Sequence, residues 1–85
     1  MISSAQIRAA RAIAGLTAAE LAACSGVGLA TIKRFERDEG VPHTRGGTLD
    51  RVKTALESAG IEFIGDPVFS PGVRLRPPAS QIASA

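Results

Sequence analysis

Two capping boxes, each followed by a glycine, divide the first third of this chain into two short helices. In a capping box, a serine or threonine caps the start of a helix, and a glutamate or glutamine three residues later bonds back to it. Glycine then closes a helix readily because it adopts a left-handed conformation. These residues are Ser3, Gln6 and Gly15 in the first segment, and Thr17, Glu20 and Gly26 in the second. The pattern predicts helices over about residues 4–14 and 18–24.

Apolar residues at helical spacing mark the side of each helix that should be buried. They are Ile7, Ala10, Ile13 and Ala14 in the first helix, and Ala18, Leu21 and Cys24 in the second. Cys24 is the only cysteine in the 85 residues, so no internal disulfide can form, which fits a reducing compartment. We expect Cys24 to be a small core residue.

Two further helices are predicted downstream. The third covers about residues 28–37, with Ile32 and Phe35 facing inward, and the glycine- and proline-rich segment DEGVPHTRGG then forms a loop. The fourth lies within TLDRVKTALESAG, where Thr48 is expected to cap the helix and Gly60 to end it. Its apolar stripe is Leu49, Val52 and Leu56.

After the fourth helix the pattern changes from helical to alternating. In both IEFI and VRLR, apolar and other side chains alternate as in a β-strand, and the turn-rich GDPVFSPG separates the two segments. A short strand pair or hairpin is therefore expected. The uncharged, proline-containing PPASQIASA predicts a disordered tail. The division is a helical domain over residues 1–60, a β extension over 61–76 and a tail over 77–85.

Charge and hydropathy narrow the function classes. A net charge of +2 permits a nucleic-acid partner without requiring one. Arginines interrupt the apolar residues near the N-terminus, so neither a signal peptide nor a membrane span is expected. Ser25, His43 and Asp50 have no spacing that suggests a catalytic triad, and His43 has no second ligand for a metal near it. We expect a protein that is not an enzyme and needs no cofactor.

The segment GLTAAELAACSGVGLATIKRFERDEG resembles the Cro/C1-type (XRE-like) helix-turn-helix family of bacterial and phage regulators. The resemblance covers about residues 4–58. Its frame consists of Ala22, Gly26, Ile32, Phe35 and Glu36. Many members have glutamine where this chain has Ala18, and serine or threonine where it has Gly28. Both differences remove a polar contact.

The resemblance implies a mostly α, four-helix domain that binds double-stranded DNA as a homodimer at a pseudo-palindromic operator, with the third helix in the major groove. It implies a transcriptional regulator, specifically a repressor, in the cytoplasm and on the nucleoid when bound. The positions it assigns to DNA contact are Leu29, Ala30 and Arg34 facing bases, Gly28 and Lys33 at the groove edge, and Arg37 and Arg45 at phosphates. It also implies an ion pair between Arg11 and Glu36 that holds the third helix at its angle.

Each of these assignments has a plainer alternative. Arg34 could be a solvated cation, and Leu29 and Ala30 could either touch a thymine methyl group or only allow close approach to the groove. Arg8 and Arg51 are expected to be ordinary surface charges. The apolar residues of the β extension could cover the domain's own core or pair with a second chain. These candidates for dimerisation are Ile61, Phe63, Ile64, Val73 and Leu75.

A different class of function also fits the sequence. The same fold could serve as a protein-interaction module, such as an antitoxin or an antiactivator. The apolar Gly28–Leu29–Ala30 start of the third helix, the alanine at position 18 and the modest net charge favour this alternative. A single basic face formed by the third helix and the following loop would argue against it.

Overall fold

Four helices and then two strands follow one another in the computed structural model, which describes residues 1–76. The helices are α1 (Ser4–Ala14), α2 (Ala18–Ser25), α3 (Leu29–Arg37) and α4 (Thr48–Ser58), and the strands are β1 (Ile61–Ile64) and β2 (Gly72–Leu75). The predicted mostly α architecture with a C-terminal strand pair is confirmed. The tail expected over residues 77–85 lies outside the described residues.

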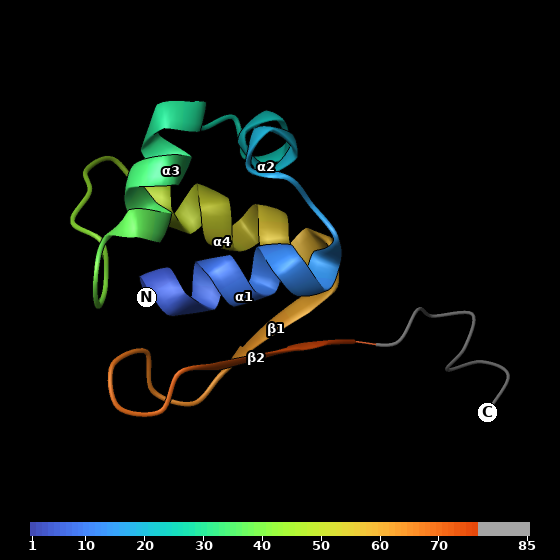
Figure 1. Ribbon diagram of the computed structural model, residues 1–85, viewed down its shortest axis with the longest axis vertical. Helices are drawn as coiled ribbons and strands as arrows, with labels where there is room; N and C mark the ends of the chain where they lie inside the picture. Colours follow the sequence, from blue (N-terminus) through green and yellow to red (C-terminus); the bar gives the residue numbers. More distant parts are fainter. Residues whose placement is uncertain (77–85) are drawn as a thin grey trace, which may run out of the picture.

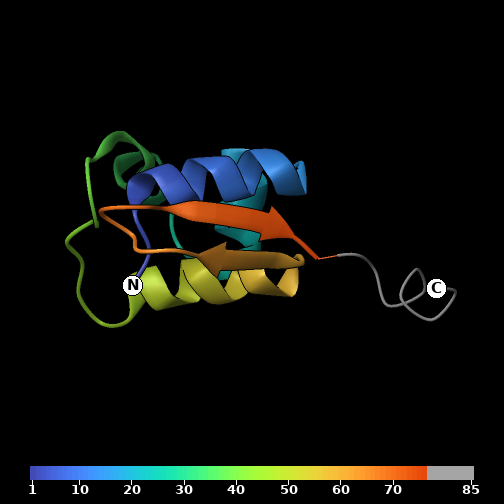
Figure 2. The ribbon, with the colours of Figure 1, turned by 90° about the horizontal axis from the view of Figure 1, so that it is seen from below.

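The elements are arranged in three layers (Figure 1). Helices α1 and α4 lie side by side in the middle layer, and α2 and α3 cover one side of it. The hairpin covers the other side, with β2 against α1 and β1 against α4 (Figure 2). The middle layer therefore separates α3 from the strands.

Both predicted capping boxes are present. The Ser3 hydroxyl accepts a hydrogen bond from the Gln6 backbone N–H at 3.2 Å, and the Ser3 N–H donates to the Gln6 side chain at 2.9 Å. Thr17 and Glu20 form the same reciprocal bonds at 3.0 and 2.9 Å. Donation from the Thr17 backbone N–H, and secondarily from its hydroxyl, lowers the pKa of Glu20. Both helices end as expected, at Gly15 and Gly26 in the left-handed conformation.

The core is shared by all four helices and β1. Its buried apolar side chains are Ile2, Ile7, Ala10, Leu21, Val27, Ile32, Phe35, Leu49, Val52, Leu56 and Ile61. The predicted inward positions of α3 and α4 are all among them. Ile2 lies ahead of the first capping box, where helical spacing could not indicate burial.

Three local expectations were wrong. Cys24 is exposed because α2 is short and buries only Leu21 fully, which leaves Cys24 at the edge of an open depression between α2 and α4. Ile13 is 44% exposed, because α1 packs through Ile7, Ala10 and Ala14 instead. Thr48 does not cap α4.

The start of α4 is set by glycine. Gly46 and Gly47 both have positive φ angles, of 64° and 71°, a conformation that other residues seldom adopt. Gly47 is the residue before the helix, so Thr48 is already its first helical residue. The Thr48 hydroxyl donates to the Arg45 carbonyl at 2.8 Å and ties the loop to the helix.

The two strands pair with each other within one chain. They are antiparallel, with Ile61 opposite Leu75 and Phe63 opposite Val73. Because directly opposed residues share a face, these four form the inner face, where Ile61 is buried and Phe63 and Val73 pack against the core. The outer face carries an ion pair between Glu62 and Arg74 at 2.6 Å. Ile61, Phe63 and Val73 therefore cover the domain's own core, whereas Leu75 at the end of β2 is 50% exposed.

Gln6 joins the first capping box to the hairpin. Its side-chain N–H groups donate to the carbonyls of Ile64 at 3.3 Å and Gly72 at 3.0 Å, while its side-chain oxygen accepts from Ser3. The residue is only 3% exposed. One side chain thus caps α1 and bonds to both strands.

Replacing Gln6 with alanine should lower the free energy of unfolding by about 2–4 kcal/mol, because a cap is lost and two strand carbonyls lose their donor. Urea denaturation measures this loss. Thr17→Ala is the matched control, since it breaks the exposed capping box of α2, which has no link to the strands. Equal losses in the two variants would contradict the role given to Gln6.

Candidate nucleic-acid interface

Helices α2 and α3 form a helix-turn-helix. The turn consists of Gly26, Val27 and Gly28, and the two helices cross steeply (Figure 1). Gly26 has a φ of 69°, and Val27 is buried beneath the turn. Ala22 is half-buried and packs against the core, where its small side chain permits close approach of the helices. Ala22 and Gly26 thus lie at the positions that the helix-turn-helix frame predicts, one between the helices and one in the turn.

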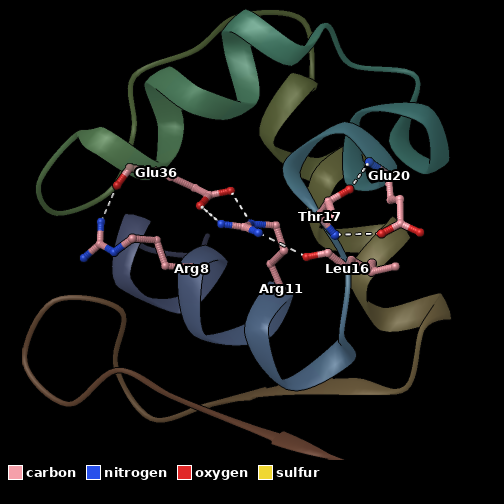
Figure 3. Close-up of polar contacts among 6 residues, drawn as sticks. All are labelled: Arg8, Arg11, Leu16, Thr17, Glu20 and Glu36. Carbon is pink, nitrogen blue, oxygen red and sulfur yellow. Dashed lines mark hydrogen bonds and ion pairs between the residues drawn. The ribbon is translucent and has the colours of Figure 1, made fainter.

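An ion pair connects α1 to the end of α3. Two nitrogens of the Arg11 guanidinium donate to the two carboxylate oxygens of Glu36, each at 2.9 Å (Figure 3). A third Arg11 nitrogen donates to the Leu16 carbonyl at 3.1 Å. The side chains of Arg11 and Glu36 are 29% and 12% exposed, and the bond to Glu36 is the main reason that the pKa of Arg11 is raised. This bidentate geometry fixes the position of α3 relative to α1.

Arg8 supports the same helix end, although the sequence suggested only a surface charge. Its guanidinium donates to the backbone carbonyl of Glu36 (Figure 3). The last carbonyls of a helix lack partners within the helix, and the helix dipole favours a cation there. Arg8 and Arg11 lie three residues apart, a spacing that places both on one side of α1. That spacing was the feature of the sequence that could have indicated the role of Arg8.

The opposite side of α3 is exposed. Ile32 and Phe35 are fully buried, whereas five residues of the helix face solvent. These five are Leu29, Ala30, Lys33, Arg34 and Arg37. The helix therefore presents an apolar first turn followed by three cations. Gly28 precedes it in an extended conformation and gives no side-chain cap.

Arg34 bends toward the loop that precedes α4. Its guanidinium carbon lies 5.2 Å from the centre of the Phe35 ring, within the range of a cation–π contact, and one nitrogen donates to the His43 carbonyl at 3.4 Å. The structure thereby brings α3 and the loop together around an open polar depression. Its lining residues are Thr31, Arg34, His43, Thr44, Arg45 and Thr48.

Two predicted DNA contacts with different roles, one at bases and one at phosphates, meet at this depression. Arg34 from α3 and Arg45 from the loop border the same hollow, together with three threonines. Guanidinium and hydroxyl groups are common partners of phosphate oxygens. Sequence reasoning missed the threonines, and the Thr44-Arg45 pair next to a double glycine was the only local signal. Lys33 and Arg37 lie outside the hollow, on the exposed face of α3.

The predicted dimerisation residues lie elsewhere. All five belong to the strands, on the far side of the middle layer from α3 (Figure 1). Ile64 and Leu75 are 41% and 50% exposed, whereas Ile61 is buried. A second chain could thus meet the hairpin without covering α3.

Neither a metal centre nor a membrane-spanning helix is found among residues 1–76. No group of three or more His, Cys, Asp or Glu side chains in this range could hold a metal ion. None of the helices described is both long enough and apolar enough to cross a membrane. A scan against models of known protein families and a search of curated proteins gave no match. The geometry of α3 and of the loop that follows it is therefore the basis for assigning a function.

Replacing Arg11 with methionine should lower the free energy of unfolding by about 1–2 kcal/mol, because a half-buried carboxylate loses its bidentate partner. Thermal or urea denaturation measures the loss. Arg74→Met is the matched control: Arg74 also pairs with a glutamate, but its side chain is 66% exposed, so less than about 0.5 kcal/mol should be lost. If both variants lose the same stability, the pair does not brace α3.

Proposed function

We propose that this protein is a sequence-specific DNA-binding transcriptional regulator that inserts α3 into the major groove. The observation that carries the proposal is the exposed face of α3, with three cations, held by Arg8 and Arg11 on a helix-turn-helix. The major groove of B-form DNA is wide enough to admit an α-helix. The apolar first turn of α3 permits close approach to the base edges, and the three cations come after it along the helix.

The distribution of charge supports nucleic acid over a protein partner. Although the net charge is only +2, four exposed cations lie on α3 and the following loop: Lys33, Arg34, Arg37 and Arg45. The one carboxylate within α3, that of Glu36, is paired with Arg11. The loop also carries the carboxylates of Asp38 and Glu39, so the concentrated basic face is the exposed side of α3, to which the loop adds Arg45. We assign Arg37 and Arg45 to phosphates, and Arg34 and the first turn of α3 to bases.

Repression is the simplest outcome of such binding. A domain that occupies promoter DNA blocks access to it, and occupancy needs no further activity. The proposal places the protein in the cytoplasm of a bacterial cell, on the nucleoid when bound. It includes no catalytic step and no cofactor.

The proposal includes a homodimer formed through the hairpin. The loop between the strands holds Phe69 at 89% exposure and Val68 at 60% exposure. It is a structured turn, because the Asp66 carboxylate accepts from the backbone N–H groups of both residues, at 2.8 and 2.9 Å. These bonds lower the pKa of Asp66. An aromatic side chain presented on an ordered turn is suited to anchor an interface with a second copy, together with exposed Ile64 on the outer face of the hairpin.

Removal of phosphate-binding cations should weaken DNA binding independently of sequence. Arg37→Gln and Arg45→Gln are each expected to reduce the slope of log K against log salt concentration by about 1. Fluorescence anisotropy with a duplex selected from a random DNA pool measures both affinity and slope. Arg74→Gln, which removes a cation on the far side of the molecule, should leave both unchanged. If the wild-type protein selects no sequence at low salt, the proposed function is wrong, and a protein-interaction role replaces it.

Phe69→Ser should shift the protein from dimer to monomer, because the exposed aromatic anchor is lost. Sedimentation velocity over a range of protein concentrations follows the shift. Ile13→Ser is the control, since it removes another exposed apolar side chain, but from α1. A wild-type protein that stays monomeric at hundreds of micromolar would refute the dimer.

A further inference from the structure

We infer that the operator half-site presents a guanine to Arg34 and a thymine to the first turn of α3, one or two base pairs apart. This inference rests on the proposed function and deepens it, because it states which base edges the helix can read. It follows from the hydrogen-bonding inventory of the exposed face of α3. That face offers hydrogen-bond donors and apolar surface. The acceptors of α3 are either bonded within the chain or lie off this face.

The acceptors of α3 can be accounted for one by one. Both carboxylate oxygens of Glu36 accept from Arg11 at 2.9 Å. The Thr31 hydroxyl belongs to a half-buried residue that lines the depression beside His43. Asp38 follows the last turn of the helix, at the end away from the groove-entering residues. None of these groups stands on the exposed face formed by Leu29, Ala30 and the cations.

The polar groups that do stand there are donors only. Lysine and arginine carry N–H groups and no acceptor. They can therefore bond to the N7 and O6 of guanine, the O4 of thymine and the N7 of adenine, but not to the amino groups of cytosine or adenine. Guanine alone offers two acceptors side by side to an arginine. A face of this composition discriminates in favour of guanine.

Arg34 is the cation best placed for that contact. Ala30 and Arg34 are four residues apart and lie on the same side of α3. Among residues 1–76, one nitrogen of Arg34 has a hydrogen-bond partner, the His43 carbonyl at a long 3.4 Å. The other N–H groups of the guanidinium are free for a bidentate bond. The same contact orients the side chain, since it links the guanidinium to the loop that carries Arg45.

The first turn supplies a second, apolar contact. Leu29 is 38% exposed and Ala30 is exposed, and neither has a polar group on its side chain. The apolar feature of the major groove is the C5-methyl group of thymine. Four residues of helix span about 6 Å, and successive bases are about 3.4 Å apart. With α3 lying along the groove, the thymine and the guanine are therefore one or two base pairs apart.

Selection from a random DNA pool, followed by base analogues in the selected duplex, tests the inference. Each guanine is replaced by 7-deazaguanine, which lacks the N7 acceptor, and each thymine by uracil, which lacks the methyl group. One guanine replacement in each half-site should weaken binding by about 5-fold or more. One thymine replacement nearby should weaken it by about 3- to 4-fold, the effect of one buried methyl group.

A change of base preference in a variant is the second test of the inference. Arg34→Gln places an amide, with both a donor and an acceptor, at the same position, so preference should move from guanine to adenine there. Arg37→Gln is the control, since it should weaken binding to all sequences without altering the preferred base.

The outcomes separate the inference from the function on which it rests. Specific binding that tolerates every deazaguanine and every uracil overturns the inference and leaves the DNA-binding function standing. An unchanged base preference in Arg34→Gln also overturns it. If no sequence is selected at all, both fail.

Discussion

The bidentate bond between Arg11 and Glu36 is the interaction on which the rest of the site depends. Helix α3 has nine residues and no side-chain cap at its start, so its position must be fixed from its other end and its buried face. Arg11 holds the Glu36 carboxylate and the Leu16 carbonyl, and Arg8 holds the Glu36 carbonyl. The same pair removes the only carboxylate of α3 from the exposed face. The Arg11–Glu36 ion pair thus contributes both to the position of α3 and to the positive charge of its exposed face.

The layered arrangement places α3 and the hairpin on opposite sides of the molecule. The middle layer of α1 and α4 lies between α3 and the hairpin, and Gln6 ties α1 to both strands. In the proposed function, a partner chain on the hairpin and DNA on α3 would therefore not compete for the same surface. In a two-fold dimer the half-sites are spaced by one helical turn of DNA, about 34 Å, or multiples of it. The orientation of the hairpin relative to α3 would then set the operator spacing.

The sequence predicted those features that depend on neighbouring residues. Both capping boxes, their closing glycines and the buried stripes of α3 and α4 follow from local spacing, and they were confirmed. The missed features depend on residues distant in the chain. Gln6 bonds to carbonyls more than fifty residues away, Arg8 meets α3 only once the helices pack, and the exposure of Cys24 depends on how little of α2 is covered. Periodicity reveals neither the strand bonds of Gln6 nor the exposure of Cys24, and for Arg8 it shows only that the residue shares one side of α1 with Arg11.

NMR chemical-shift mapping with a selected duplex tests most directly whether the exposed side of α3 is the surface that binds DNA. Titration of the labelled protein should shift the amide signals of Leu29–Arg37 and of residues 43–48, together with the side-chain signals of Arg34. Signals of β1 and β2 should stay in place at a constant dimer population. Shifts confined to the hairpin, with α3 unchanged, would contradict the account.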